Sequence, residues 1–237
     1  MDKFWNKAES ENLAIVRWCL SPAKIADLSF QDFYQMVTTR NSGIRQYRRL
    51  HKIWETAPYS IGCRATAASQ LEAGLLVDNV NYFKKQIEEV EGTIFDICQS
   101  YEQYEYLKTI PGFGPYVSAV VLAAIGNPDR FENVSQVIKL AGFDLNAHRS
   151  GNKSATAVPV ISKKGKADLR YALYQAAIVA SSLTAHFRAY YHRLLEGRQK
   201  EKGIRTKMRV KLATKLLVIA WTLMKKREAF NPEFVKV

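Results

Sequence analysis

The sequence predicts an all-α protein in which a long coiled-coil helix is followed by a helical domain that contains a helix-hairpin-helix unit and a long basic loop. Three observations lead to this prediction. Apolar residues recur at helical spacing through most of the 237 residues. One stretch keeps a heptad period, and prolines and glycines gather mainly between the predicted helices. We therefore divide the chain into a helical segment at 1–60, a coiled-coil helix at 61–106 and a carboxy-terminal domain at 107–237.

The first segment is predicted to contain three helices within residues 3–57. Ser21-Pro22 and the polar stretch 38–43 separate them, because proline rarely continues a helix and short polar stretches favour turns. Ser29 stands three residues before Asp32, a spacing at which a serine hydroxyl satisfies a free amide at the start of a helix. We expect this pair to cap the second helix. Nothing in the segment suggests a chemical role.

Residues 64–105 contain no proline and carry apolar residues at alternating intervals of four and three. The residues that keep this period are Leu76, Val80, Phe83, Ile87, Val90, Ile94, Ile97, Tyr101 and Tyr104. A helix buries such a 3.5-residue repeat by winding around a partner. At ~1.5 Å per residue the helix would reach ~60 Å. We expect its stripe to meet another chain or an antiparallel helix, the alternative being that residues 1–57 fold back over it.

Residues 107–142 read LKTIPGFGPYVSAVVLAAIGNPDRFENVSQVIKLAG and predict a helix-hairpin-helix unit. One helix ends before the turn Pro111-Gly112-Phe113-Gly114, and the next opens with Pro115 at its first position, where proline is favoured. The glycines permit a tight turn through which the backbone approaches a ligand closely, and amides at the next helix start face outward. Such a turn suits a phosphate group. It is also found as a purely structural link between helices.

A polar, basic connection is predicted at 144–166, interrupted only by the short apolar run 157–161. Loops of this length inside a compact domain are usually functional or disordered, and its composition favours function. Three helices are expected to complete the domain, at about 167–183, 185–195 and 208–226, with a charged linker at 196–206.

The charge of the chain is concentrated in its last hundred residues. The formal net charge is +13, and residues 139–237 hold 21 basic and 6 acidic residues, whereas residues 1–138 hold 14 basic and 16 acidic. A polyanion such as DNA is the expected partner, and its affinity for the chain should fall steeply with salt. We expect little preference for base sequence, because lysines and hairpin amides contact the backbone. The alternative is that the excess basic residues serve only to keep the protein surface soluble.

The residues expected to contact DNA are the hairpin turn and the basic side chains of the loop and the final helix. They are Gly112, Phe113, Gly114, Arg149, Lys153, Lys163, Lys164, Lys166, Arg170, Lys207, Arg209 and Lys211.

Other classes of protein are disfavoured by composition. No apolar run reaches the ~18 residues of a membrane span. The three cysteines are an odd number, which disfavours a disulfide framework. The cysteines and the four histidines also lack the spacing of a zinc site, so we expect no metal in this chain.

Three stretches in this order resemble the carboxy-terminal domain of the insertion-sequence transposases called the one-ten family. They are IPGFGPYVSAVVLAAIGNPDRF, KLAGFDLNAHRSGN and PVISKKGKADLRYALYQAA. The resemblance covers 107–229 closely and the preceding segments more loosely. It implies a DEDD-type recombinase that is guided by a bridge RNA and acts in the cytoplasm of a bacterium or archaeon, in association with the nucleoid.

The resemblance also implies a nucleophile. In this family a serine within a Ser-Gly pair of the loop attacks a DNA phosphodiester and carries the strand as a phosphoserine; here the pair is Ser150-Gly151. A free serine hydroxyl is a poor nucleophile and needs a metal or base to take its proton. His148 is close in sequence, but the resemblance assigns proton removal to a separate acidic domain.

That acidic domain is where this sequence departs from the family. Family members carry an amino-terminal RNase-H-like domain whose four acidic residues hold Mg²⁺, whereas residues 1–57 here are predicted to be helical. We expect the chain to be a truncated piece with residues 1–60 as the remnant of a linker, to bind no cofactor of its own, and to cut no DNA alone.

Two other readings stay open. The chain could be a non-catalytic module that binds DNA or RNA and forms homo-oligomers through the coiled coil. It could also be a base-excision glycosylase of the helix-hairpin-helix type, for which Asp129 and Asp144 are the nearby candidates; Asp129, however, falls in a helix-stop signal.

Overall fold

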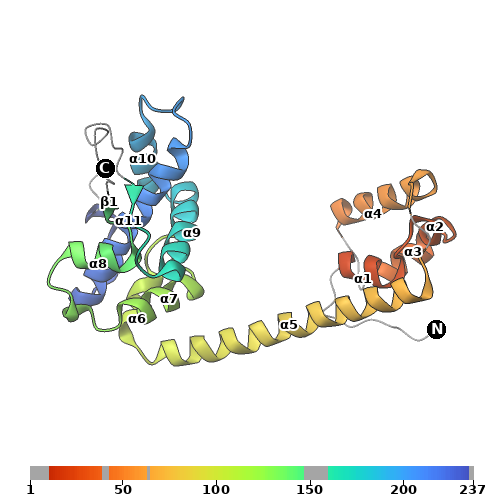
Figure 1. Cartoon of the computed structure of the whole chain (residues 1–237), viewed down its shortest axis with the longest axis horizontal. Helices are drawn as coiled ribbons and strands as arrows, with labels where there is room; N and C mark the ends of the chain where they lie inside the picture. Colours follow the sequence, from red (N-terminus) through yellow and green to blue (C-terminus); the bar gives the residue numbers. More distant parts are fainter. Residues whose placement is uncertain (1–10, 39–42, 63–64, 147–159, 235–237) are drawn as a thin grey trace, which may run out of the picture. The chain divides into compact units, whose positions relative to one another are not determined.

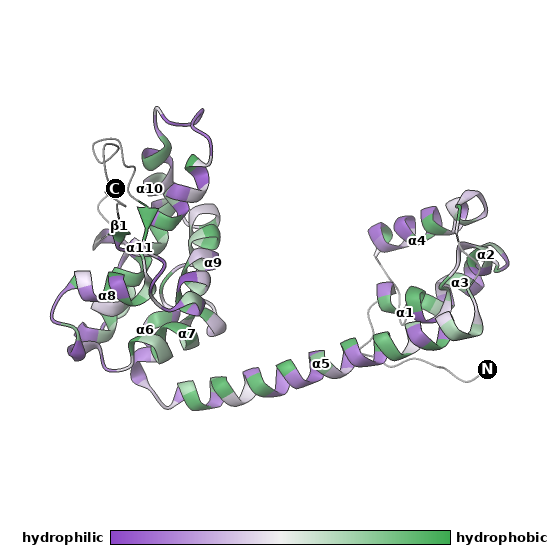
Figure 2. Ribbon diagram, viewed as in Figure 1, coloured by the Kyte–Doolittle hydropathy of each residue, from purple (hydrophilic) through white to green (hydrophobic). Residues whose placement is uncertain are grey.

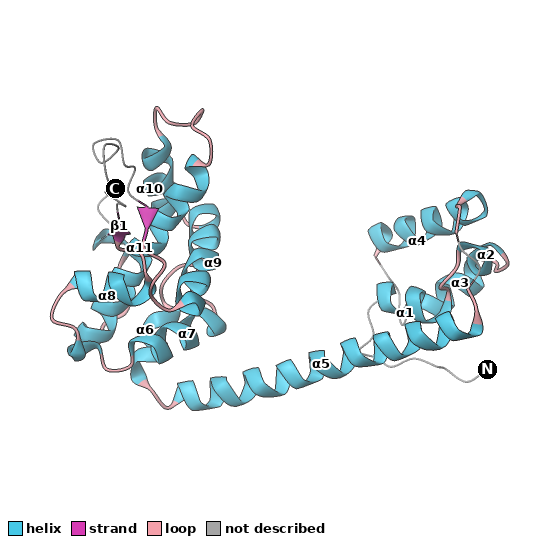
Figure 3. Ribbon diagram, in the orientation of Figure 1, coloured by secondary structure: helices cyan, strands magenta, loops and turns pink. Residues whose placement is uncertain are grey.

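The computed structural model describes residues 11–38, 43–62, 65–146 and 160–234. The chain divides into two compact units, Met1–Val90 and Glu91–Val237, called here the amino-terminal and the carboxy-terminal unit. Helices make up almost all of the regular structure, and the described residues contain a single pair of short strands (Figures 1 and 3). The prediction of an all-α protein is confirmed.

The amino-terminal unit consists of short helices and the first part of a long one. They are α1 (Glu11–Trp18), α2 (Pro22–Ala26), α3 (Phe30–Val37), α4 (Ile44–Thr56), η1 (Ala57–Tyr59) and α5 (Ala67–Gln99). Their shared core contains Ala14, Phe33, Val37 and Leu50, all fully buried. This core holds the short helices together, because helices of this length are marginal without tertiary packing.

The expected breaks occur, with one more between Ala26 and Phe30. Pro22 stands at the first position of α2. The Ser29 hydroxyl accepts a hydrogen bond from the Asp32 amide at 3.1 Å and donates one to the Asp32 carboxylate at 2.6 Å. The cap predicted from this pair is therefore present, on the third helix of the unit rather than the second.

Helix α5 carries the heptad stripe on its exposed surface. Of the nine predicted positions, the seven from Leu76 to Ile97 lie on this helix, and they are 41–61% exposed. Ala73 and Val77, by contrast, are buried. The described part of residues 1–57 therefore does not cover the stripe.

The long helix ends earlier than the heptad pattern predicts. Ser100 terminates α5 by donating its hydroxyl to the Ile97 carbonyl at 2.7 Å, and a separate helix, α6 (Glu102–Lys108), follows. Tyr104 is only 2% exposed in the core of the carboxy-terminal unit, and its hydroxyl donates to the Pro115 carbonyl at 3.3 Å. Burial of this ring favours the bend over continuation of the helix.

The carboxy-terminal unit is organised around α9. Its elements are the last turns of α5, α6, α7 (Pro115–Ile125), η2 (Pro128–Arg130), α8 (Val134–Ala141), β1 (Leu145–Asn146), β2 (Val160–Ile161), α9 (Ala167–Leu183), α10 (Ala185–Leu195), α11 (Ile204–Lys226) and η4 (Pro232–Phe234). Helices α7, α8, α10 and α11 all contact α9. Four fully buried alanines on α9 allow this close packing, namely Ala172, Ala176, Ala177 and Ala180.

Helix α11 begins at Ile204, four residues before the predicted start. Gly203 precedes it with a φ of 74°, and Ile204 packs with Tyr191, Leu195 and Met208. Because Ile204 is buried in this small core, the last residues of the predicted linker are helical.

The connection between α8 and α9 doubles back on itself through two glycines. Gly142 ends α8 with a φ of 67°, which favours glycine, and residues 162–166 return alongside residues 140–144. The amide of Lys166 donates to the Leu140 carbonyl at 2.7 Å, and the amide of Lys163 to the Gly142 carbonyl at 3.0 Å. A Cβ atom on Gly165 would lie 2.3 Å from the Gly142 nitrogen. We call this contact the Gly142–Gly165 crossing.

No helix in the described ranges is long and apolar enough to cross a membrane.

Substitution of Gly165 tests the crossing. In Gly165→Ala the new methyl group would lie 2.3 Å from both the Gly142 nitrogen and the Leu140 carbonyl oxygen, so backbone must move. We expect a loss of about 3 kcal/mol in the free energy of unfolding and a Tm lower by about 6–12 °C, measured by circular dichroism.

Gly92→Ala is the matched control in the same unit, since a Cβ there meets nothing within 4 Å. It should raise stability by about 1 kcal/mol, because alanine favours a helix over glycine. A Gly165→Ala protein as stable as the parent would contradict the crossing.

Candidate nucleic-acid interface

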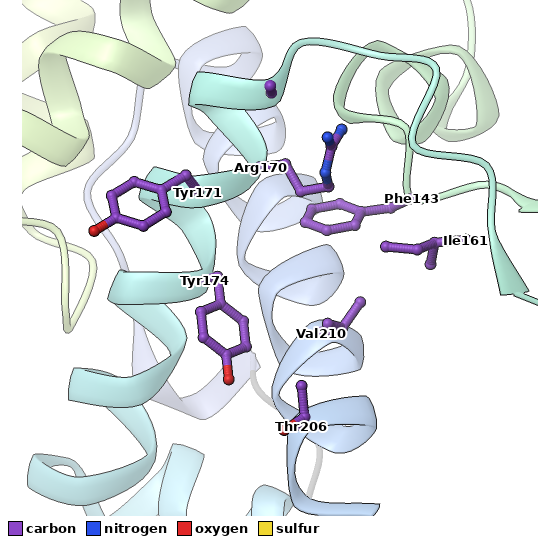
Figure 4. Close-up of a pocket in the computed structure, with 8 residues that line it drawn as sticks. Phe143, Ile161, Arg170, Tyr171, Tyr174, Thr206 and Val210 are labelled. Atoms are coloured by element: carbon purple, nitrogen blue, oxygen red, sulfur yellow. The ribbon is translucent and has the colours of Figure 1, made fainter. Parts of the chain in front are cut away.

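A shallow pocket brings together the two basic segments that sequence analysis singled out. It measures about 360 Å³ and is lined by Phe143, Ile161, Ala167, Arg170, Tyr171, Tyr174, Thr206 and Val210 (Figure 4). The lining residues come from the segment just after α8, from β2, from the first turns of α9 and from the start of α11. The expected DNA contacts after β2 and those on α11 therefore lie on elements that border the same hollow.

Lysines follow β2 directly at the edge of this pocket. Lys163, Lys164 and Lys166 are exposed, and none forms an ion pair with a carboxylate in the described ranges. Their backbone is fixed by the Gly142–Gly165 crossing, and Lys163 adopts a φ of 57°. Three cations on one anchored turn can neutralise neighbouring phosphates.

Arg170 has a partly structural role. Its Nη1 atom donates to the Ala141 carbonyl at 2.8 Å and to the Gly165 carbonyl at 3.4 Å. The guanidinium group thus ties the end of α8 to the returning chain, while the side chain lines the pocket. Its contribution to the site is to hold the crossing.

On α11, Lys207 and Lys211 are exposed and four residues apart, so they lie on one side of the helix. Arg209 is half-buried, with its guanidinium carbon 5.8 Å from the centre of the Tyr191 ring and its Nε atom without a partner in the described structure. The two lysines are available to a phosphate, whereas Arg209 packs against Tyr191 of α10.

The hairpin turn lies on the other side of α9. A Cβ on Gly112, whose φ is 92°, would meet the Ala176 carbonyl oxygen at 2.5 Å, and Phe113 is 5% exposed. On a helix of 3.6 residues per turn, Ala176 lies about 120° from Arg170 and about 160° from Tyr174 around the helix axis. The tight turn thus packs against the backbone of α9. Of the three turn residues expected to contact DNA, only Gly114 is exposed. Ser118 and Ala119 on α7 are buried.

The predicted nucleophile Ser150 lies outside the described residues, as do Arg149, Lys153 and His148. The positions at which the chain leaves and returns are described, however. Strands β1 and β2 pair antiparallel, with Leu145 opposite Ile161 and Asn146 opposite Val160. The described residues that flank 147–159, Asn146 and Val160, are therefore neighbours, and Ile161 lines the pocket.

The aspartates considered for a glycosylase have structural roles. The amide of Asp129 donates to the Asn127 side chain at 2.9 Å in η2, which is the expected helix stop. Asp144 accepts a hydrogen bond from the Ser162 hydroxyl at 2.6 Å and so joins the two sides of the returning chain. The described ranges hold no group of three or more His, Cys, Asp or Glu side chains that could bind a metal ion.

Sequence analysis missed an aromatic and cationic cluster on α10 and α11. The Lys215 ammonium group lies 4.1 Å from the centre of the Tyr190 ring, and the Arg193 guanidinium lies 5.7 Å from it. Burial is the main cause that lowers the pKa of Lys215, and repulsion from the Arg193 charge lowers it further. The spacing of Lys207, Lys211 and Lys215 along α11 is the signal that could have found it.

The comparisons with known proteins agree with the resemblance seen in the sequence. Residues 104–192 match the sequence model of the Transposase IS116/IS110/IS902 family. The pilin gene-inverting proteins of Moraxella lacunata and Moraxella bovis are each 26% identical to the chain over 165 residues. These alignments cover 65% of this chain and 48% of each relative, so the chain spans about half the length of the curated relatives it matches.

The matched segment begins at the buried Tyr104 of α6 and ends within α10, and it includes the hairpin turn, the Gly142–Gly165 crossing and the early part of α9 that lines the pocket. Residues 104–192 of this chain are therefore similar in sequence to the transposase domain of the IS116/IS110/IS902 family.

Proposed function

We propose that the carboxy-terminal unit binds DNA through its phosphate backbone and presents Ser150 as the nucleophile of strand exchange. The observation that carries the proposal is the anchoring of both ends of residues 147–159 beside three exposed lysines. Ser150 follows Asn146 by four residues, so the chain can carry it no further than about 14 Å from β1. We expect a DNA strand held by the lysines to lie within this reach, because Asn146 pairs with Val160, three residues before Lys163.

The proposed chemistry is a transesterification. The Ser150 oxygen forms a bond to a DNA phosphorus atom while the bond from phosphorus to one strand end breaks. The hydroxyl proton goes to a base and the departing oxygen takes up a proton. The lysines stabilise the negative charge that develops on the phosphoryl oxygens. The magnesium that the resemblance implies has no ligand set among the described residues, so what this unit supplies is the hydroxyl and the cations.

The class of reaction is proposed from the family and the curated relatives. A transposase domain acts on DNA, and the two Moraxella relatives are named for inverting a gene. Inversion needs two DNA sites to be cut and rejoined with exchanged partners. We infer that this chain takes part in a recombination of this class, with DNA and a guide RNA as its nucleic-acid partners.

A second copy of the chain is the partner proposed for α5. Its exposed apolar positions keep a strict heptad spacing, which is the pattern that a coiled-coil partner buries. Two DNA sites are brought together most simply by two linked protomers. This association would also be expected of a module that binds nucleic acid without cutting it, so oligomerisation by itself does not decide between the two functions.

Removal of two lysine charges tests DNA binding. The double variant Lys164→Gln/Lys166→Gln should lower the slope of log affinity against log salt by about 1.8, because each phosphate contact contributes about 0.9 for duplex DNA. Fluorescence anisotropy with a labelled duplex between 50 and 200 mM salt measures the slope. Lys84→Gln, an exposed lysine on α5, should leave it unchanged. An unchanged slope in the double variant would remove these lysines from the interface.

Substitution of Ser150 separates catalysis from binding. In a full-length protein that also carries the acidic domain, Ser150→Ala should abolish recombination between two element ends in cells, because no other group would form the bond to phosphorus, while affinity for DNA changes by less than about twofold. Ser154→Ala, a serine in the same segment, is the matched control and should retain recombination. Recombination by Ser150→Ala at the parental level would favour the non-catalytic binding module.

Charges placed on the heptad stripe test self-association. Phe83→Glu/Ile87→Glu should shift the chain toward the monomer in sedimentation equilibrium, because like charges would face each other across the seam. Tyr82→Glu is the matched control, since Tyr82 is 59% exposed but lies off the stripe. A parent chain that is monomeric at all concentrations would contradict the proposed partner.

A further inference from the structure

A second cationic surface lies outside the matched transposase domain, on α4 of the amino-terminal unit. This helix carries Arg45, Arg48, Arg49 and Lys52 against a single acid, Glu55, although residues 1–138 as a whole have more acidic than basic residues. Polar and charged residues recur along α4 in Figure 2. Such a local excess of positive charge on one helix is a candidate anion-binding surface.

The core of the unit fixes which side of α4 faces outward. Leu50 is fully buried and packs with Ala57 and Ile53 in the hydrophobic core. With 100° between successive residues, Tyr47, His51 and Trp54 lie together on the next side of the helix. Arg48 and Lys52 follow on the side beyond that, and both are exposed. An aromatic row therefore runs beside a basic row.

Contacts with α3 hold the aromatic row in place. The Phe30 ring packs against all three rings of the row, with centroid distances of 5.2 Å to Tyr47, 4.7 Å to His51 and 5.8 Å to Trp54. The Trp54 indole nitrogen donates to the Leu28 carbonyl at 2.8 Å. Rings fixed in this way lose little conformational freedom when a ligand binds.

The outer part of the row offers ring surface to a ligand. Tyr47 is 46% exposed, the His51 side chain is 39% exposed, and their planes are inclined by only 23° with centroids 6.2 Å apart. Aromatic rings beside a basic row are the arrangement on which unpaired bases stack while their phosphates are neutralised. A duplex hides its base faces and would use only the cations.

We propose that α4 binds an unpaired nucleic-acid strand. Bases stack on Tyr47 and His51, and phosphates are held by Arg45, Arg48 and Lys52. The ligand chemistry is shared by single-stranded RNA and single-stranded DNA. The site lies outside residues 104–192 and needs neither Ser150 nor the lysines after β2. Binding at α4 can therefore be tested independently of the proposed strand exchange.

The test measures binding of the whole 237-residue chain to three probes of one sequence: a labelled 12-nucleotide RNA, the same strand as DNA, and the DNA duplex. Arg45→Glu/Arg48→Glu should weaken at least one single-stranded probe by tenfold or more and lower its salt slope by about 0.7 per lost phosphate contact. The duplex, held by the other unit, should change by less than twofold. RNA and DNA affinities compared in the parent chain identify which strand is preferred.

The aromatic contribution is tested by three substitutions at one position. Tyr47→Leu keeps an apolar contact with Phe30 but removes the ring face, and it should weaken the single-stranded probe about tenfold. Tyr47→Phe keeps the face and should bind like the parent, and Tyr47→Ala with normal circular dichroism should behave like Tyr47→Leu. Tyr82→Ala and Lys84→Glu, both exposed on α5, should change nothing.

Three outcomes would overturn the proposal. One is parental binding of the single strands by both the charge-reversal variant and Tyr47→Leu. Another is a parallel loss of duplex and single strand in the charge-reversal variant, which would make α4 a general phosphate surface. The third is equal competition by an acidic peptide of the same charge, which would show that bases contribute nothing. Loss of duplex binding in Lys164→Gln/Lys166→Gln with intact single-strand binding would separate the two sites.

Discussion

The close contact between Gly142 and Gly165 is the constraint on which the candidate site depends. A Cβ on either residue would overlap backbone atoms of the other strand of the crossing, so the chain can double back here only because both residues are glycine. The crossing fixes the backbone of Lys163 and Lys164, directs α9 into the core, and is held further by hydrogen bonds from Arg170. It is therefore a rigid base for the segment that carries the predicted nucleophile.

Helix α9 separates the two features that first suggested nucleic-acid binding. One side of α9 carries Arg170 and Tyr174 toward the pocket, and the hairpin turn at Gly112 packs against the helix backbone at Ala176 on another side. The small side chains of Ala176 and Ala180 allow the turn to approach the helix backbone. The turn thus contributes to the interface by fixing the position of α9, and the basic segments on the pocket side contribute the cations.

The two proposed binding surfaces differ in character. The surface beside the pocket combines exposed lysines with a backbone held by hydrogen bonds, which would suit the regular phosphates of a duplex. The surface on α4 combines arginines with fixed aromatic rings, which suits unpaired bases. The first lies on the segment that matches the transposase family model and on α11, whereas the second lies on the amino-terminal unit.

The sequence by itself determined the features that depend on neighbours within about one helical turn. The cap at Ser29, the helix start at Pro115 and the intervals of the heptad stripe were predicted in this way, and the concentration of charge after residue 138 follows from composition alone. Only the tertiary structure decided that Tyr104 leaves the heptad helix for the core, that Ile204 extends α11, and that Gly112 serves α9. These outcomes depend on contacts between residues far apart in the chain, whose burial outweighs local helical preference, and no local pattern encodes them.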